Sequence, residues 1–300
     1  MQHRAPIGGR KPLYPMAFVS IQGVNHYYEW ITPYHNLPDA RKPTLVFLHG
    51  WAGSTRYWRS TAQHLQTDFN TLLYDLRGFG RSRLPQPTPD QPLRDYHLES
   101  YAEDLRDLLD RLGLERVYLN AHSTGASIAA VFLQRYPDRV HKAILTCSGI
   151  FEYDELAFKI FHWVSGYVVK FRPQWFLQIP ELDRLFMNRF LYQPIPPDDR
   201  RAFLEDFIAA DAAAAIGTVY TAVSKEAAEQ MPQVFQSITV PTLLVSGEYD
   251  QIIPADLGRN AAALNPTIDY YCLPKTAHFP MLENPPVYLK KIQDFLRSGD

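Results

Sequence analysis

Short runs of apolar residues recur along the chain, and each run ends in a glycine, a polar residue or an acid. The runs are rich in leucine and β-branched residues, and polar positions do not alternate with the apolar ones. This pattern is typical of strands that are buried on both faces of a parallel sheet. We therefore predict buried strands within residues 43–50, 70–82, 116–123, 142–149 and 240–250.

Amphipathic segments with the helical repeat lie between these runs. From Leu98 to Leu114, apolar side chains recur every three or four residues, with acids and arginines on the opposite face. Similar patterns cover residues 125–139 and 285–298. Strands that alternate with helices predict an α/β fold with a mostly parallel sheet. Residues 16–32 instead predict two antiparallel strands around Gly23, at the edge of that sheet.

The alternation stops between Phe151 and Ser237, where the sequence is helical and aromatic. Buried strands resume only at residue 240. A helical block that interrupts an α/β alternation indicates an insertion over the carboxyl edge of the sheet. We predict a core domain formed by residues 1–150 and 238–300, and a helical cap or lid subdomain formed by residues 151–237.

Composition and charge exclude several classes of protein. The chain has 300 residues, of which 46% are hydrophobic, enough to bury a large core without disulfides. A formal net charge of −2 gives no electrostatic reason to expect nucleic acid or an anionic membrane as a partner. Cys147 and Cys272 lie in apolar, strand-like runs and are predicted to be buried, reduced thiols.

The sequence predicts no cofactor and no membrane anchor. Gly78 and Gly80 lack the third glycine of a dinucleotide-binding loop, and no group of His, Cys and carboxylates has the spacing of metal ligands. Residues 1–18 carry charge but no apolar core of a signal peptide. No apolar run reaches the roughly 18 residues of a spanning helix. We expect a soluble, cytoplasmic protein without a transmembrane segment.

The run Val117–His122 passes directly into a helical pattern at Ser123, with no spacer between them. Small residues, Ala121 and Gly125, flank the serine, where larger side chains would collide with neighbouring backbone. A serine on such a strand-to-helix turn fits a nucleophile elbow, although Ala121 replaces the first glycine of the usual Gly-x-Ser-x-Gly pattern. The turn would hold the hydroxyl above the sheet at a helix N-terminus, where backbone N–H groups stabilise negative charge.

Two further residues could complete a catalytic triad with Ser123. Asp250 follows a buried run in "SGEYD", and His278 stands in "KTAHFP" after the last strand-like run. The order serine, acid, histidine suits this kind of sheet. We predict that Ser123 is the nucleophile, that His278 is the base, and that Asp250 orients the base.

Other polar residues at strand ends have different expected roles. His49 and His122 are predicted to be structural residues that hydrogen-bond neighbouring loops, and Asp75 is predicted to organise a turn. Asp154 and Glu152 follow the predicted sixth strand and are the alternative to Asp250 as the triad acid.

Taken together, these segments resemble the α/β-hydrolase superfamily, in its capped, serine-nucleophile, carboxylesterase-like branch. The matching motifs are "FLHGWAGS", "LLYDLRGFGRS", "NAHSTGAS", "LLVSGEYDQIIP" and "AHFPMLENP". They extend from Phe47 to Pro285, nearly the whole chain. The resemblance implies an eight-stranded sheet with a helical cap. It also implies an oxyanion hole formed by the backbone N–H of Trp51, together with that of Thr124 at the helix start.

The predicted reaction is hydrolysis of an ester or thioester through an acyl-enzyme on Ser123. Relatives that cleave epoxides or haloalkanes carry aspartate at the elbow, so the serine argues against both activities. Two alternatives stay open at this stage. The chain could be a ligand-binding or receptor protein on the same fold, or a carbon–carbon hydrolase or perhydrolase with the same triad. Oligomeric state and natural substrate stay undetermined.

Aromatic residues of the predicted cap suggest an apolar small-molecule substrate. Phe158, Phe161, Trp163 and Trp175 are candidates for an acyl pocket beside Ser123. The simpler alternative is that they pack the cap on the sheet. They could also let the cap rest on lipid, which the lack of a basic face disfavours.

Overall fold

A single sheet forms the centre of the protein. The computed structural model describes residues 16–33, 38–85 and 95–298. The sheet has eight strands in the order β1-β2-β4-β3-β5-β6-β7-β8. The strands are β1 (Met16–Ile21), β2 (Val24–Ile31), β3 (Thr44–Leu48), β4 (Asn70–Tyr74), β5 (Val117–His122), β6 (Val140–Thr146), β7 (Thr242–Gly247) and β8 (Ile268–Leu273). In sheet order from β4 to β8, neighbouring strands are parallel. Strand β2 is antiparallel to both of its neighbours, β1 and β4, and turns into β1 at Gly23. The predicted fold class is therefore confirmed.

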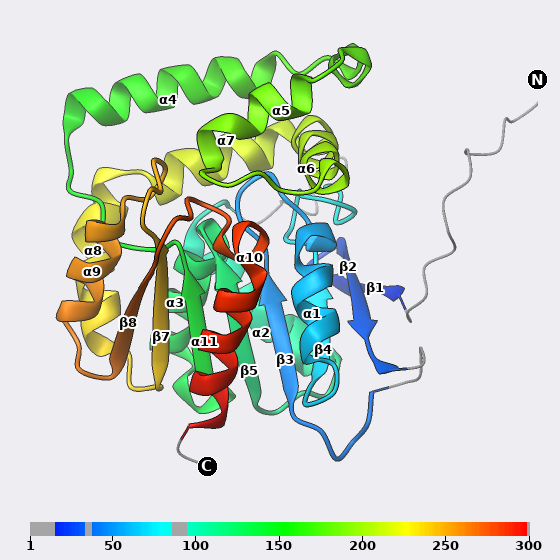
Figure 1. Cartoon of the computed structure of the whole chain (residues 1–300), viewed down its shortest axis with the longest axis vertical. Coiled ribbons are helices and arrows are strands. Elements are labelled where there is room, and N and C mark those ends of the chain that lie inside the picture. Colours follow the sequence, from blue (N-terminus) through cyan, green and yellow to red (C-terminus); the bar gives the residue numbers. More distant parts are fainter. Residues whose placement is uncertain (1–15, 34–37, 86–94, 299–300) are drawn as a thin grey trace, which may run out of the picture.

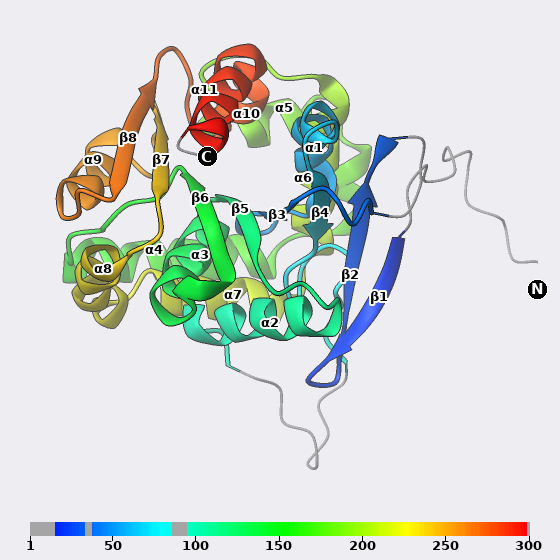
Figure 2. The same cartoon turned by 90° about the horizontal axis from the view of Figure 1, so that it is seen from below.

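Helices cover both faces of the sheet. The α-helices of the described residues are α1 (Arg59–Leu65), α2 (Leu98–Arg111), α3 (Thr124–Arg135), α4 (Glu155–Lys170), α5 (Leu182–Met187), α6 (Pro197–Ala209), α7 (Ala212–Ala222), α8 (Lys225–Ser237), α9 (Ala255–Ala263), α10 (Pro280–Glu283) and α11 (Pro285–Arg297). Figure 2 shows α1 and α11 on one face, and α2, α3 and α8 on the other.

The central strands are buried on both faces, which explains their continuous apolar sequence. On β3, Leu45 and Phe47 belong to the core under α1 and α11, and Val46 and Leu48 belong to the core under α2 and α3. Because successive side chains of a strand point to opposite faces, both sets must be apolar.

The helical segment between β6 and β7 lies across the carboxyl ends of the strands (Figure 1). Helices α4 to α7 form this layer, and α4 packs on α7. Helix α8 instead packs against α3 and α9 beside the sheet. The segment above the strand ends therefore finishes at the end of α7, so we propose that the cap ends near Val223, before α8, rather than at residue 237.

Two sequence expectations concern membranes and export. Within the described residues, none of the helices has both the length and the apolar character needed to cross a bilayer. The prediction that a signal peptide is lacking concerns residues 1–18, of which residues 1–15 lie outside the described part.

A buried ion pair ties the loop after β4 to α2. The Nε atom of Arg77 donates to Oδ2 of Asp104 over 2.7 Å, and both side chains are almost completely buried. The guanidinium also donates to the carbonyl of Asp95 and lies over the Tyr101 ring, 4.6 Å from its centroid. If Arg77 were removed, the buried carboxylate of Asp104 would lose this ion pair.

We expect Arg77→Met to lower the free energy of unfolding by about 3–5 kcal/mol, because the Asp104 carboxylate stays in the core after its ion-pair partner is removed. Arg297→Met is the matched control, because Arg297 pairs with Asp68 at the surface, where a pair contributes about 1 kcal/mol or less. Urea denaturation of both variants measures the difference. Equal losses would show that burial of the Arg77 pair has no special energetic consequence.

Candidate active site

The backbone at Ser123 has an unusual conformation. Ser123 lies between β5 and α3 with φ 55° and ψ −125°. A non-glycine residue with positive φ is strained and is retained only where its surroundings hold it. Here its N–H donates to the carbonyl of Thr146 on β6, and its carbonyl accepts from the N–H groups of Ala126 and Ser127 in α3. The serine therefore stands on a fixed, sharp turn at the carboxyl end of the central strand.

Two glycines allow the loop after β3 to lie against this turn. A Cβ atom on Gly125 would lie 2.4 Å from the carbonyl oxygen of His49. A Cβ atom on Gly50 would lie 3.0 Å from Cβ of Ser123. Any side chain at Gly125 would push the two segments apart. The small residue that the sequence pattern required at position 125 is therefore explained by a close contact between backbones.

Ser123, His278 and Asp250 meet above the sheet in a linear arrangement. Nε2 of His278 lies 3.1 Å from Oγ of Ser123, and Nδ1 of His278 lies 2.8 Å from Oδ2 of Asp250. All three side chains are buried. The strand order brings them together from β5, from the loop after β7 and from the loop after β8. Since Asp250 accepts from Nδ1–H, the neutral imidazole presents an unprotonated Nε2 to the serine.

The second oxygen of Asp250 is held by backbone. Its Oδ1 accepts from the N–H groups of Ile252 and Ile253 over 2.8 and 3.0 Å. Burial raises the pKa of this carboxyl, but His278 and these two donors outweigh burial and lower the pKa below its usual value. The carboxylate of Asp250 is therefore ionised at neutral pH. The alternative acid, Asp154, caps the start of α4 by accepting from the N–H of Ala157, and Glu152 is exposed.

Donors for an oxyanion are available beside Ser123. Thr124 is the first residue of α3, and the first N–H groups of a helix have no partner within the helix. Trp51 follows Gly50 in the loop that lies against the elbow, and its indole Nε1 donates to the carbonyl of Ala215 in α7 over 2.9 Å. The backbone role of both residues stays a prediction, and the indole fixes the loop to the helices above it.

Comparison with known proteins identifies the family. Residues 43–285 match the family model of the α/β-hydrolase fold. The chain belongs to the α/β-hydrolase family. It is 28% identical to epoxide hydrolase 3 of Xenopus tropicalis, over 87% of this chain and 73% of that protein. It is 24% identical to a proline iminopeptidase of Heyndrickxia coagulans, over 85% of this chain and 90% of the relative.

A solved esterase of Exiguobacterium antarcticum superposes with a TM-score of 0.77, at 19% identity, over 94% of this chain and 99% of the esterase. This likeness shows the shared fold. Together these comparisons place the chain among hydrolases of the α/β fold.

A chain of buried hydrogen bonds links three loops of this α/β-hydrolase. Nε2 of His122 lies 2.7 Å from the carbonyl of His278, so this nitrogen must carry the proton. Nδ1 of His122 then accepts from the hydroxyl of Tyr57 over 3.0 Å, and that hydroxyl accepts from the N–H of Gly50 over 2.6 Å. Burial, with a smaller contribution from His278, lowers the pKa of His122 well below its usual value. The neutral ring thus joins the loop after β3 to the backbone of the proposed base.

His49 and Asp75 organise the loops after β3 and β4, as the sequence suggests. Nε2 of His49 accepts from the N–H of Leu76, and its Nδ1 donates to the carbonyl of Gly50. The carboxylate of Asp75 accepts from the N–H of Thr55 and from the N–H and Nε of Arg81. The positions of Tyr57 and of this network were not predicted, because a tyrosine seven residues after a glycine has no local signal.

No set of side chains in the described part of the hydrolase is left free to hold a metal at the site. Ligand atoms of His122, Cys147 and His278 lie within 4.8 Å of one another. The ring nitrogens of both histidines are already hydrogen-bonded within the network described above. Both cysteines are free thiols, and Cys147 is buried as predicted, whereas Cys272 is only half-buried because it lies on the edge strand β8.

An apolar cavity of about 460 Å³ opens between the helices above the strand ends. Its lining residues are Tyr167, Val168, Phe171, Phe176, Leu182, Phe186, Leu204 and Phe207. The ring of Phe207 lies 5.9 Å from that of Trp51, and Phe186 reaches Phe190, whose ring lies 6.1 Å from His278. Aromatic rings therefore form a continuous wall from the cavity to the candidate site.

The four aromatics predicted for a pocket lie elsewhere. Phe161, Trp163 and Trp175 are exposed, and Phe158 is buried against the ring of Tyr153. None of the four lines the cavity. Three of the four lie on α4, and the apolar side of this helix, with Phe161 and Trp163, faces outwards, so a hydrophobic pattern alone could not show which residues line a cavity.

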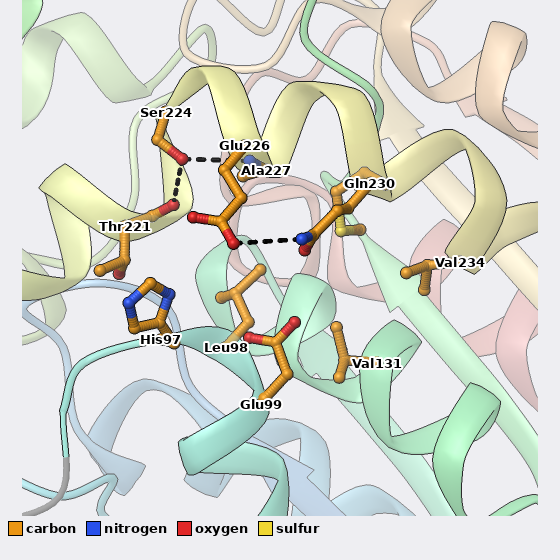
Figure 3. Close-up of a pocket in the computed structure, with 11 residues that line it drawn as sticks. His97, Leu98, Glu99, Val131, Thr221, Ser224, Glu226, Ala227, Gln230 and Val234 are labelled. Atoms are coloured by element: carbon orange, nitrogen blue, oxygen red, sulfur yellow. Dashed lines mark hydrogen bonds between the residues drawn. The ribbon is translucent and has the colours of Figure 1, made fainter.

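A second recess lies where the N-terminus of α2 meets α3 and α8 (Figure 3). Its volume is about 20 Å³, room for about one water molecule. Four of its lining residues bond in pairs: Ser224 to the carbonyl of Thr221, and Gln230 to Glu226. This recess is a helix junction and cannot hold a substrate.

Tyr57→Phe tests the buried hydrogen-bond chain. The change leaves the Gly50 N–H and Nδ1 of His122 without their partner, so we expect stability to fall by about 1–3 kcal/mol. We also expect kcat on a short nitrophenyl ester to fall by roughly tenfold, because the loop and the base lose their common support. Tyr101→Phe removes a similarly buried hydroxyl bond, to the carbonyl of Arg77, far from the site. It should lower stability but leave kcat unchanged; similar kcat values in the two variants would contradict a positioning role for Tyr57.

Proposed function

We propose that this protein hydrolyses an ester or thioester of an apolar small molecule through an acyl-enzyme on Ser123. The observation that carries the proposal is the linear set of contacts, 3.1 Å from Ser123 to His278 and 2.8 Å from His278 to Asp250, on a strained elbow. A serine hydroxyl is a poor nucleophile by itself and needs an adjacent base. In this site the base is within hydrogen-bond reach, and its far nitrogen is held by an ionised carboxylate.

In the first half-reaction, Oγ of Ser123 attacks the carbonyl carbon while Nε2 of His278 takes the hydroxyl proton. The new negative charge develops on the carbonyl oxygen, which the N–H groups of Thr124 and Trp51 would stabilise. Each such donor contributes about 3 kcal/mol to transition-state stabilisation in comparable sites. His278 then gives its proton to the departing alkoxide or thiolate, leaving the acyl group on Ser123.

In the second half-reaction, a water molecule replaces the leaving group. His278 takes a proton from this water, the resulting hydroxide attacks the acyl carbon, and the collapse of the tetrahedral intermediate returns the proton to Oγ of Ser123. Throughout, Asp250 stays ionised and stabilises the imidazolium. The lowered pKa of Asp250 supports this role.

The elbow residue separates this proposal from epoxide hydrolysis, the activity in the name of one relative. Epoxide opening in this superfamily uses an elbow aspartate, whose carboxylate attacks a ring carbon. Ser123 has no carboxylate. A serine with a histidine base suits attack on a carbonyl, which also agrees with the esterase among the structural relatives.

The apolar cavity supports a substrate with a medium or long acyl chain, or an aromatic ester. Its volume of about 460 Å³ is within the usual range for small-molecule sites. The wall formed by Phe207, Phe186 and Phe190 leads from it towards Trp51 and His278. An acyl chain lying along this wall would leave its carbonyl near Ser123.

Labelling with a fluorophosphonate probe, located by peptide mass spectrometry, tests the nucleophile. We expect an adduct on Ser123 in the wild type, and loss of labelling in Ser123→Ala and His278→Ala. Ser127→Ala, one turn further along α3, should label normally. Circular dichroism shows whether each variant is folded. A folded wild type with no adduct on Ser123 would count against the proposal and favour a ligand-binding role.

Leu182→Trp and Leu185→Trp form a matched pair for the cavity. Both residues lie on α5, but Leu182 lines the cavity and Leu185 is 72% exposed. We expect Leu182→Trp to lower kcat/KM for a decanoate ester by about tenfold or more, since the added ring fills space that the chain needs, with little change for butyrate. Leu185→Trp should change neither. Equal effects on the two esters would show that the cavity does not hold the acyl chain.

A further inference from the structure

Helix α4 exposes an unusual amount of apolar surface. Its inner side, with Phe158, Gly166 and Val169, is buried, and His162 donates to the carbonyl of Val223 after α7. The outer side is also apolar. The exposed large hydrophobic residues of α4 and of the segment after it are Leu156, Ile160, Phe161, Trp163, Val164, Tyr167, Val168, Phe171, Trp175 and Ile179. We call this set the α4 outer face.

Such a surface needs a partner, because the apolar side of an amphipathic helix is normally its buried side. Isolated exposed apolar residues are ordinary, but a contiguous patch marks an interaction site. Helix α4 is the outermost helix above the strand ends in Figure 1, so no other described element covers this side.

The kinds of residue on the α4 outer face are those that favour a lipid interface. Trp163, Tyr167 and Trp175 are all more than half exposed. Their amphipathic rings suit the boundary between lipid headgroups and acyl chains. From residue 156 to residue 180 the chain contains no Asp or Glu, and its charged residues are Lys159, Lys170 and Arg172. Glu155, which precedes this segment, pairs with Lys159, so the remaining positive charge is that of Lys170 and Arg172, and the segment is not repelled by an anionic membrane surface.

The α4 outer face is continuous with the apolar cavity. Tyr167, Val168 and Phe171 are exposed on this face and also line the cavity. An apolar molecule held at the face would therefore meet the cavity without crossing water. A second copy of the chain docked here would instead cover these three residues and the cavity opening beside them.

We propose that the α4 outer face rests on a lipid bilayer, so that the acyl substrate passes from lipid into the cavity. The route to Ser123 rests on the proposed function, whereas binding to lipid does not. Insertion of apolar side chains provides most of the attraction, and the basic residues add a smaller part. The sequence expectation disfavoured lipid because no basic face is evident; the exposure of the apolar side, which only the fold reveals, reverses that expectation.

Vesicle binding tests the surface independently of catalysis. The probe is a suspension of unilamellar vesicles of phosphatidylcholine with or without phosphatidylglycerol, mixed with the full-length Ser123→Ala protein and separated by flotation. We expect binding to both compositions, somewhat stronger with phosphatidylglycerol, that persists at high salt. Ile160→Glu should lower the partition coefficient by about tenfold or more, since a charge replaces an inserted apolar side chain.

Phe18→Glu is the matched control. Phe18 is 58% exposed and Ile160 is 54% exposed, but Phe18 lies on edge strand β1, away from α4. It should bind vesicles as the parent does. Equal losses in both variants, failure of the folded parent protein to bind, or binding that disappears at high salt would overturn the proposal. So would sedimentation showing a dimer that Ile160→Glu dissociates, with no vesicle binding.

Two substrates separate this proposal from the proposed function. With Ser123 intact, Ile160→Glu should hydrolyse a water-soluble butyrate ester at the wild-type rate, but a long-chain ester embedded in vesicles about tenfold more slowly. Vesicle binding without any ester hydrolysis would contradict the proposed function and retain the lipid surface. Hydrolysis of both esters at unchanged rates in the variant would retain the function and overturn delivery from lipid.

Discussion

The left-handed backbone of Ser123 is the constraint on which the rest of the site depends. It directs the side chain away from the sheet at the point where β5 becomes α3, and hydrogen bonds to β6 and α3 hold it there. The loop after β3 can approach this turn only because Gly50 and Gly125 have no side chains. Strain at one residue and close backbone contact at two others therefore fix the loop after β3 beside the hydroxyl of Ser123.

Buried polar groups then fix the orientation of His278, the proposed base. Asp250, itself held by two backbone donors, sets the tautomer of His278. A neutral His122 and Tyr57 connect the carbonyl of His278 to the N–H of Gly50. In a low-dielectric interior an unpaired member of such a chain is costly, so the network has one arrangement. The proposed base and the proposed oxyanion loop are thereby held as one unit.

The layer above the strand ends carries two apolar surfaces. Its inner aromatics surround an apolar cavity that leads towards His278, and α4 turns a second apolar side outwards. Tyr167 and Phe171 belong to both surfaces. The proposed acyl pocket and the proposed lipid surface therefore share residues of the same helix.

The sequence by itself determined the strand and helix alternation, the edge hairpin around Gly23, and the positions of Ser123, Asp250 and His278 at the ends of buried runs. These features are local, because burial on both faces makes a strand continuously apolar, and chemistry in such sheets lies at the carboxyl ends. Only the tertiary structure decided which aromatics line the cavity, how Tyr57 and His122 join distant loops, and that α8 belongs beside the sheet. In α4, the periodicity separates polar residues such as Lys159 and His162 from apolar ones, but it does not show that Phe158 is buried and that Trp163 is exposed. That distinction depends on packing between segments far apart in the chain.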